Sequence, residues 1–141
     1  MSPVKPSPLL RFALALDAGV SALIAVVQLL LTDWLARQTS LPFALLLESG
    51  VFMVGYAVVL VWLARRAELR SGWILLIVLG NLGWALACAT VWLSGLLSVS
   101  PLGAAYLMMQ AIGVVVFAAL QYRGLAVSTR SGMDLHARAG I

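Results

Sequence analysis

Four long apolar segments alternate with short polar stretches along the 141-residue chain. We expect these segments at residues 12–31, 43–64, 73–93 and 102–120. Each is close to the roughly 20 residues that a helix needs to cross the 30 Å hydrocarbon core of a bilayer. Helices are the expected form, because lipid cannot satisfy the backbone groups at an open sheet edge. The pattern predicts an all-α membrane protein, a four-transmembrane-helix up-down bundle.

The stretches outside these segments are short and polar. Residues 1–11 are interpreted as a basic, proline-containing leader and residues 121–141 as a basic, mobile tail. Within the transmembrane domain, residues 12–120, the connections are expected to be a polar loop at 32–41 and a tight basic loop at 65–70. Connections of this length favour antiparallel neighbours, as in an up-down bundle.

Lysine and arginine are distributed unevenly between the two predicted membrane faces. One face receives Lys5, Arg11, Arg65, Arg66, Arg70, Arg123, Arg130 and Arg138, and the other receives Arg37. Cytoplasmic loops carry the excess of basic residues in membrane proteins. The sequence therefore predicts that both termini are cytoplasmic.

The composition agrees with a membrane protein and limits the chemistry. Hydrophobic residues make up 63% of the chain and charged residues 10%, whereas soluble domains carry about 25% charged residues. The single cysteine, Cys88, cannot form an internal disulfide or a CxxC pair. The single histidine, His136, lies in the predicted tail, so a bis-histidine haem or a histidine-based metal site is not expected. We predict no metal and no cofactor.

Each predicted span carries polar side chains away from its ends. From a helical rise of about 1.5 Å per residue, we predict two polar layers with Trp84 between them. The inner layer comprises Asp17, Tyr56 and Asn81, and the outer layer comprises Gln28, Glu48 and Gln110. The other tryptophans, Trp34, Trp62, Trp73 and Trp92, lie near span ends, as in an aromatic belt.

Asp17 and Glu48 are the residues in this set that are hardest to place in lipid. An acid in a bilayer costs at least about 2.5–3.5 kcal/mol on insertion scales. No lysine or arginine lies within a predicted span, so an intramembrane ion pair is not available within the chain. We expect both acids to be protonated or to be hydrogen-bond donors, unless a hydrated cavity reaches them. The polar set has two interpretations, hydrogen bonding between helices or a binding site in which Trp84 stacks on a flat ligand.

Small residues within the spans predict close helix packing. Ala15-x-x-x-Gly19, Ala18-x-x-x-Ala22 and Gly83-x-x-x-Ala87 have the spacing that lets two helical backbones approach. Further glycines of the second and fourth spans are Gly50, Gly55 and Gly113.

Several short motifs, taken as a set, resemble a known group of proteins. They are Leu-Asp17-Ala, Leu-Glu48-Ser-Gly50, Asn81-x-x-Trp84, Gln110-Ala111 and Leu120-Gln121-x-x-Gly124-Leu125. Residues 9–126 thereby resemble the small four-span integral membrane proteins that are widespread in bacteria. The resemblance implies a four-span fold in the bacterial inner membrane. It implies no reaction and no functional residue.

We expect a non-enzymatic module that binds a lipophilic small molecule or a partner subunit through a polar-lined bundle interior. The expected partners are the lipid bilayer and further subunits, as a homodimer or a larger membrane complex. The alternative is a small proton-coupled transporter, working as a dimer, with Asp17 as the coupling carboxylate. Paired-carboxylate catalysis is not expected, because Asp17 and Glu48 are predicted near opposite faces. Nucleic acid is not an expected partner, because the basic residues are scattered beside the membrane.

Overall fold

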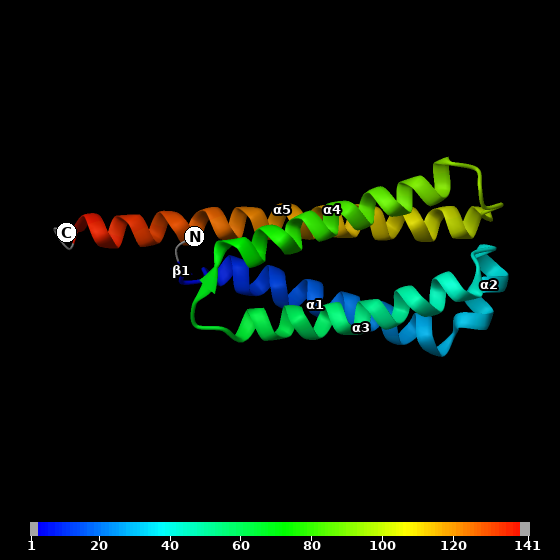
Figure 1. Cartoon of the computed structure of the whole chain (residues 1–141), viewed down its shortest axis with the longest axis horizontal. Helices are drawn as coiled ribbons and strands as arrows, with labels where there is room; N and C mark the ends of the chain where they lie inside the picture. The colour runs from blue at the N-terminus through cyan, green and yellow to red at the C-terminus, as the bar shows by residue number, and fades with distance from the viewer. Residues whose placement is uncertain (1–2, 139–141) are drawn as a thin grey trace.

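The computed structural model describes the backbone of residues 3–138 and the side chains of residues 3–129. Four long helices run along one axis, with a short helix and a two-stranded ribbon at opposite ends (Figure 1). The helices are α1 (Pro8–Leu30), α2 (Thr32–Thr39), α3 (Phe43–Arg65), α4 (Ser71–Leu93) and α5 (Pro101–Arg138). The antiparallel ribbon pairs β1 (Pro3–Val4) with β2 (Leu69–Arg70).

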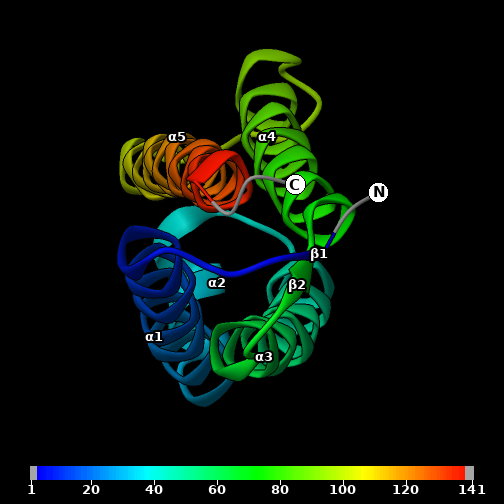
Figure 2. The same cartoon turned by 90° about the vertical axis from the view of Figure 1, so that its left-hand side faces the viewer.

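The long helices form two antiparallel pairs, α1 with α3 and α4 with α5. The end-on view shows the two pairs stacked on each other (Figure 2). They join along α1 and α5, whereas α3 and α4 approach each other closely at few positions. The predicted all-α, four-helix architecture is confirmed. The helices pack less closely between α3 and α4 than between α1 and α5.

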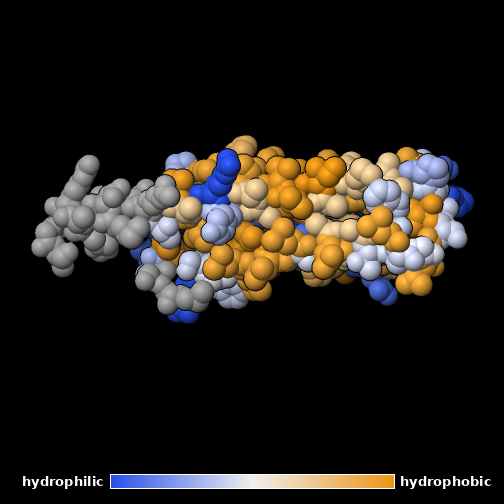
Figure 3. Space-filling model, turned by 90° about the horizontal axis from the view of Figure 1, so that it is seen from above, coloured by the Kyte–Doolittle hydropathy of each residue, from blue (hydrophilic) through white to orange (hydrophobic). Residues whose placement is uncertain are grey.

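The outer surface of the bundle is apolar over its central part. The helices α1, α3 and α4 have 23 residues each, which corresponds to about 35 Å of helix. Together with Pro101–Thr129 of α5, they are long and apolar enough to cross a membrane. One face shows the hydrophobic middle between more hydrophilic ends (Figure 3). The chain is a multi-pass helical membrane protein.

The tryptophans divide into two groups by exposure. Trp34, Trp62, Trp73 and Trp92 are all exposed and lie near helix ends, as expected for side chains at the membrane interface. Trp84 lies in the middle of α4 and is only partly accessible. Trp84 therefore belongs to the interior of the bundle and not to the tryptophans at the membrane interface.

Two segments differ from the sequence expectation. The helix α5 continues past the boundary predicted at residue 120, and Gln121, Gly124 and Ser128 are buried within the bundle. The expected tail is therefore helical as far as Arg138, and residues 139–141 lie outside the described residues. The loop expected at 32–41 contains α2, whose residues Leu35 and Thr39 are buried.

The start of α1 is fastened to α5 by hydrogen bonds. The Ser7 side chain caps α1 by accepting a hydrogen bond from the Leu10 N–H at 3.2 Å. The same hydroxyl donates to the Gly124 carbonyl at 2.9 Å, and the Ser7 N–H donates to Ser128 Oγ at 2.8 Å. The residue that caps α1 thus also holds residues 124–128 of α5 in place, more than 100 residues later in the chain.

Close helix contacts occur at other small residues than the predicted motifs. A Cβ on Gly124 would lie 2.7 Å from the Leu10 Cα, and one on Gly50 would lie 3.0 Å from the Leu29 side chain. In contrast, a Cβ on Gly19 or Gly83 would meet nothing within 4 Å. The predicted motifs that contain Gly19 and Gly83 therefore do not bring helices together within this chain. Gly55 and Gly113 likewise make no close helix contact, whereas Gly50 does.

We expect Gly124→Ala to lower the free energy of unfolding by about 1–3 kcal/mol, because the added methyl group collides with backbone atoms of α1. Gly19→Ala is the matched control, since its methyl group enters open space. Helix content followed by circular dichroism during titration with a denaturing detergent would measure both. Equal stability of the two variants would contradict the close approach at Gly124.

Candidate functional site

The Asp17 carboxylate is the centre of a hydrogen-bond network that includes all four long helices. It is fully buried. Its Oδ2 accepts hydrogen bonds from Gln121 Nε2 at 2.7 Å, Tyr56 Oη at 3.0 Å and Asn81 Nδ2 at 3.1 Å. Its Oδ1 accepts one from Ser21 Oγ at 3.1 Å, one turn along α1. The predicted layer of Asp17, Tyr56 and Asn81 therefore exists.

The partners of Asp17 also bond to one another. Asn81 Nδ2 lies 3.1 Å from Gln121 Oε1, and Tyr56 Oη lies 2.9 Å from Asn81 Oδ1. In the described part of the chain, no buried side-chain nitrogen or oxygen atom is without a partner. All four side chains around the carboxylate are neutral donors. Asp17 is thus held by hydrogen bonds, as an acceptor, and not by an ion pair.

A second polar cluster is centred on Gln28, farther along α1. The Gln28 amide nitrogen donates to the Leu46 carbonyl at 2.6 Å and to Ser49 Oγ. Its carbonyl oxygen accepts a hydrogen bond from Tyr106 Oη at 2.9 Å. This cluster joins α1, α3 and α5.

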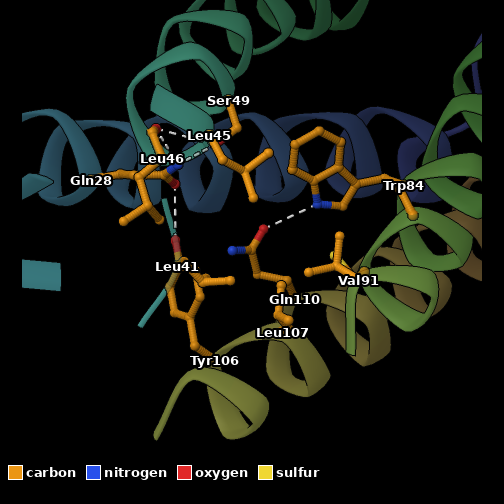
Figure 4. Close-up of a pocket in the computed structure, with 12 residues that line it drawn as sticks. Gln28, Leu41, Leu45, Leu46, Ser49, Trp84, Val91, Tyr106, Leu107 and Gln110 are labelled. Carbon is orange, nitrogen blue, oxygen red and sulfur yellow. Dashed lines mark hydrogen bonds between the residues drawn. The ribbon is translucent and has the colours of Figure 1, made fainter. Parts of the chain in front are cut away.

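Gln110 and Glu48, predicted in the same layer as Gln28, have other surroundings. The Gln110 oxygen accepts a hydrogen bond from Trp84 Nε1 at 3.0 Å, which joins α5 to α4 (Figure 4). Glu48 is exposed and takes no part in the clusters described. The physical reason is the helical repeat: adjacent residues differ by about 100°, so Ser49 faces α1 and Glu48 faces outward. Glu48 therefore does not belong to the predicted layer, whereas its other two members, Gln28 and Gln110, line one cavity.

Three aromatic rings extend from this polar interior towards the side of the bundle. Phe52 and Trp84 are stacked, with ring centroids 5.9 Å apart and planes within 7°. Phe52 also stacks on Tyr56, at 6.4 Å and 11°. Phe52 is 59% exposed. The three nearly parallel rings link α3 and α4 where their backbones stay apart.

A cavity of about 260 Å³ lies between α3 and α4. Phe52, Leu76 and Gly80 line it and are exposed, so it opens on the lipid-facing side of the bundle. Tyr56 and Asn81, which hold Asp17, line it as well. The cavity is therefore a lateral pocket with apolar walls and a polar floor.

A second cavity, of about 120 Å³, shares Trp84 with the first. It is lined by both remaining polar groups, Gln28 with Tyr106 and Gln110 (Figure 4). The buried thiol of Cys88 also lines it. Among the described residues, no group of three or more His, Cys, Asp or Glu side chains converges to hold a metal ion.

No protein-family model, no curated protein and no solved structure matches this chain. Its class therefore follows from the fold and the site alone. The fold and the site define a multi-pass membrane protein built around a buried polar network at Asp17.

The predicted polar set does not include Gln121, Ser21 or Ser49. Gln121 was assigned to the tail, although it lies three turns after Gln110 on the same face of α5. That spacing was the signal for its burial. Ser21 lies one turn after Asp17, so the helical repeat places it on the same face of α1. Ser49 gave no such signal, because its neighbour Glu48 is the more conspicuous polar residue.

A double-mutant cycle would test the network. We expect Asp17→Asn and Gln121→Leu to couple by about 0.5–3 kcal/mol in unfolding free energy, because their side chains share a hydrogen bond. Asp17→Asn with Gln110→Leu is the control pair, since the two residues share no hydrogen-bond partner. Its effects should add within about 0.3–0.5 kcal/mol. Additive effects in the first pair would contradict the network.

Proposed function

We propose that this protein is a non-enzymatic membrane module that binds a lipophilic molecule in the lateral pocket between α3 and α4. The observation that carries the proposal is the pocket itself, about 260 Å³ and open at Phe52, Leu76 and Gly80 towards the lipid. Small-molecule sites are concave, mostly apolar and equipped with a few placed polar groups. A ligand dissolved in the bilayer reaches such a pocket without crossing a polar surface.

The polar floor supports a binding role more than a role in proton transfer. The single hydroxyl hydrogen of Tyr56 is taken by Asp17 or Asn81, and both amide hydrogens of Asn81 are directed at Asp17 and Gln121. The floor of the pocket is thus saturated with respect to donors. It is held rigidly and shapes the pocket.

The alternative function, proton-coupled transport by a dimer, has less support. A coupling carboxylate must exchange its proton with water. Asp17 is fully buried, and its four neutral donors occupy both carboxylate oxygens. The arrangement favours a fixed hydrogen-bond acceptor.

The lateral pocket is tested with a variant that keeps Trp84 as its sole tryptophan. The other four are replaced by phenylalanine. We expect 1-bromo-4-decylbenzene, a lipophilic heavy-atom quencher, to quench Trp84 fluorescence saturably in proteoliposomes, because Trp84 lines the pocket. In a variant that keeps only Trp73, which is exposed to lipid, quenching should rise linearly with the membrane concentration of the probe. Linear quenching in both variants would refute the proposed function.

Filling the pocket should weaken the binding of the probe that causes saturable quenching. Gly80 lines the pocket, and a Cβ there meets nothing within 4 Å, so leucine extends into the free volume. We expect Gly80→Leu to raise the half-saturating probe concentration at least about tenfold, equivalent to roughly 1.4 kcal/mol. Gly19→Leu, on the open outer face of α1, is the control and should have no effect. A similar response of the two variants would place the probe elsewhere.

A further inference from the structure

We infer that the ligand carries a flat, carbonyl-bearing ring on an alkyl or isoprenoid tail, and that Gln110 donates a hydrogen bond to the carbonyl oxygen. This inference rests on the proposed function and specifies its ligand. The ring would occupy the 120 Å³ cavity and the tail the 260 Å³ lateral pocket, with Trp84 forming a wall of both.

The first argument is the distribution of hydrogen-bond donors. Both hydrogens of the Gln28 amide are directed at Leu46 and Ser49, and the Tyr106 hydroxyl donates to Gln28. The Gln110 amide differs. Its oxygen accepts from Trp84, and its nitrogen points away from Trp84 towards Tyr106 (Figure 4).

The Tyr106 oxygen can accept one of the two Gln110 N–H groups. Gln110 is 7% exposed and lines the 120 Å³ cavity, so its other N–H can donate to a ligand oxygen placed there. Such a hydrogen bond contributes about 0.5–1.5 kcal/mol. The cavity thus favours a ligand with an acceptor over a plain hydrocarbon.

The second argument is the shape of the walls. The rings of Trp84 and Tyr106 both line the 120 Å³ cavity and offer flat faces for offset stacking. A cavity of about 150 Å³ in another protein holds benzene, so 120 Å³ corresponds to roughly one six-membered ring. A phospholipid head group is too large for this space. A ring with a carbonyl oxygen fits both the walls and the donor.

The larger cavity suits the tail. The polar groups on its floor, Tyr56 and Asn81, have their hydrogens engaged in the Asp17 network, so no donor competes for the carbonyl oxygen there. Leu76 and Ile77 supply apolar wall. The tail leaves the bundle through the opening beside the exposed Phe52.

The test compares two probes on the protein with Trp84 as sole tryptophan. 4-Decylacetophenone carries one carbonyl group on a six-membered ring, and 1-bromo-4-decylbenzene has the same ring and tail with bromine in place of the acetyl group. We expect 4-decylacetophenone to quench Trp84 at a lower half-saturating concentration. Gln110→Met, which keeps the length of the side chain but removes the donor, should weaken the binding of 4-decylacetophenone about 2- to 10-fold and leave the brominated probe unchanged.

The outcomes separate the two proposals. If neither probe quenches saturably, the proposed function fails, and this inference fails with it. If the brominated probe binds but Gln110→Met changes both probes equally or neither, only the assignment of a carbonyl-bearing ligand to Gln110 is refuted.

A second measurement needs no substitution. 4-Decylacetophenone labelled with ¹³C at its carbonyl carbon should show, when bound to the unaltered chain, a carbonyl stretching band at lower wavenumber than in protein-free liposomes. A hydrogen bond to the oxygen weakens the C=O bond and causes this shift. An unshifted band would overturn the inference.

Discussion

The fold depends on the hydrogen bonds that α3, α4 and α5 donate to Asp17 of α1. Within a bilayer there is no water to satisfy a carboxylate, and there is little hydrophobic drive between helices. The lone pairs of Asp17 are satisfied only when Tyr56, Asn81 and Gln121 lie at the same depth and face inward. A shift of one residue in any helix would turn its donor by about 100°. The network therefore fixes the register of all four helices.

The same network explains why the bundle is open on one side. It joins α3 to α4 through long side chains, Tyr56 to Asn81 and Phe52 to Trp84. These contacts hold two helices together at a distance and do not require small residues between the backbones. On the opposite side Gly124 lets α5 lie directly against Leu10 of α1. Close packing on one side and side-chain bridges on the other leave a lateral pocket between α3 and α4.

Much of this arrangement was predictable from the sequence. Apolar length gave the four helices, and depth estimates grouped Asp17 with Tyr56 and Asn81 correctly. The errors arose where tertiary contacts override local pattern. Gln121 follows an apolar span and resembles the start of a tail, but the partner that buries it is Asp17, 104 positions earlier in the chain. Glu48 has the composition of a site residue, and only the rotation of α3 about its axis shows that it faces outward.

The saturation of Asp17 also decides where ligand specificity can arise. A carboxylate whose oxygens already accept four hydrogen bonds has no need of a ligand, and the donors that hold it are committed. The burial of Asp17, which is costly in a bilayer, is thus explained by its role in holding the helices together. Under the proposed function, recognition of the ligand would then fall to groups outside this network, which are the flat faces of the aromatic rings and the Gln110 amide beside Trp84. The proposal thus divides the polar residues of this bundle into a set that holds the helices in register and a smaller set that would bind the ligand.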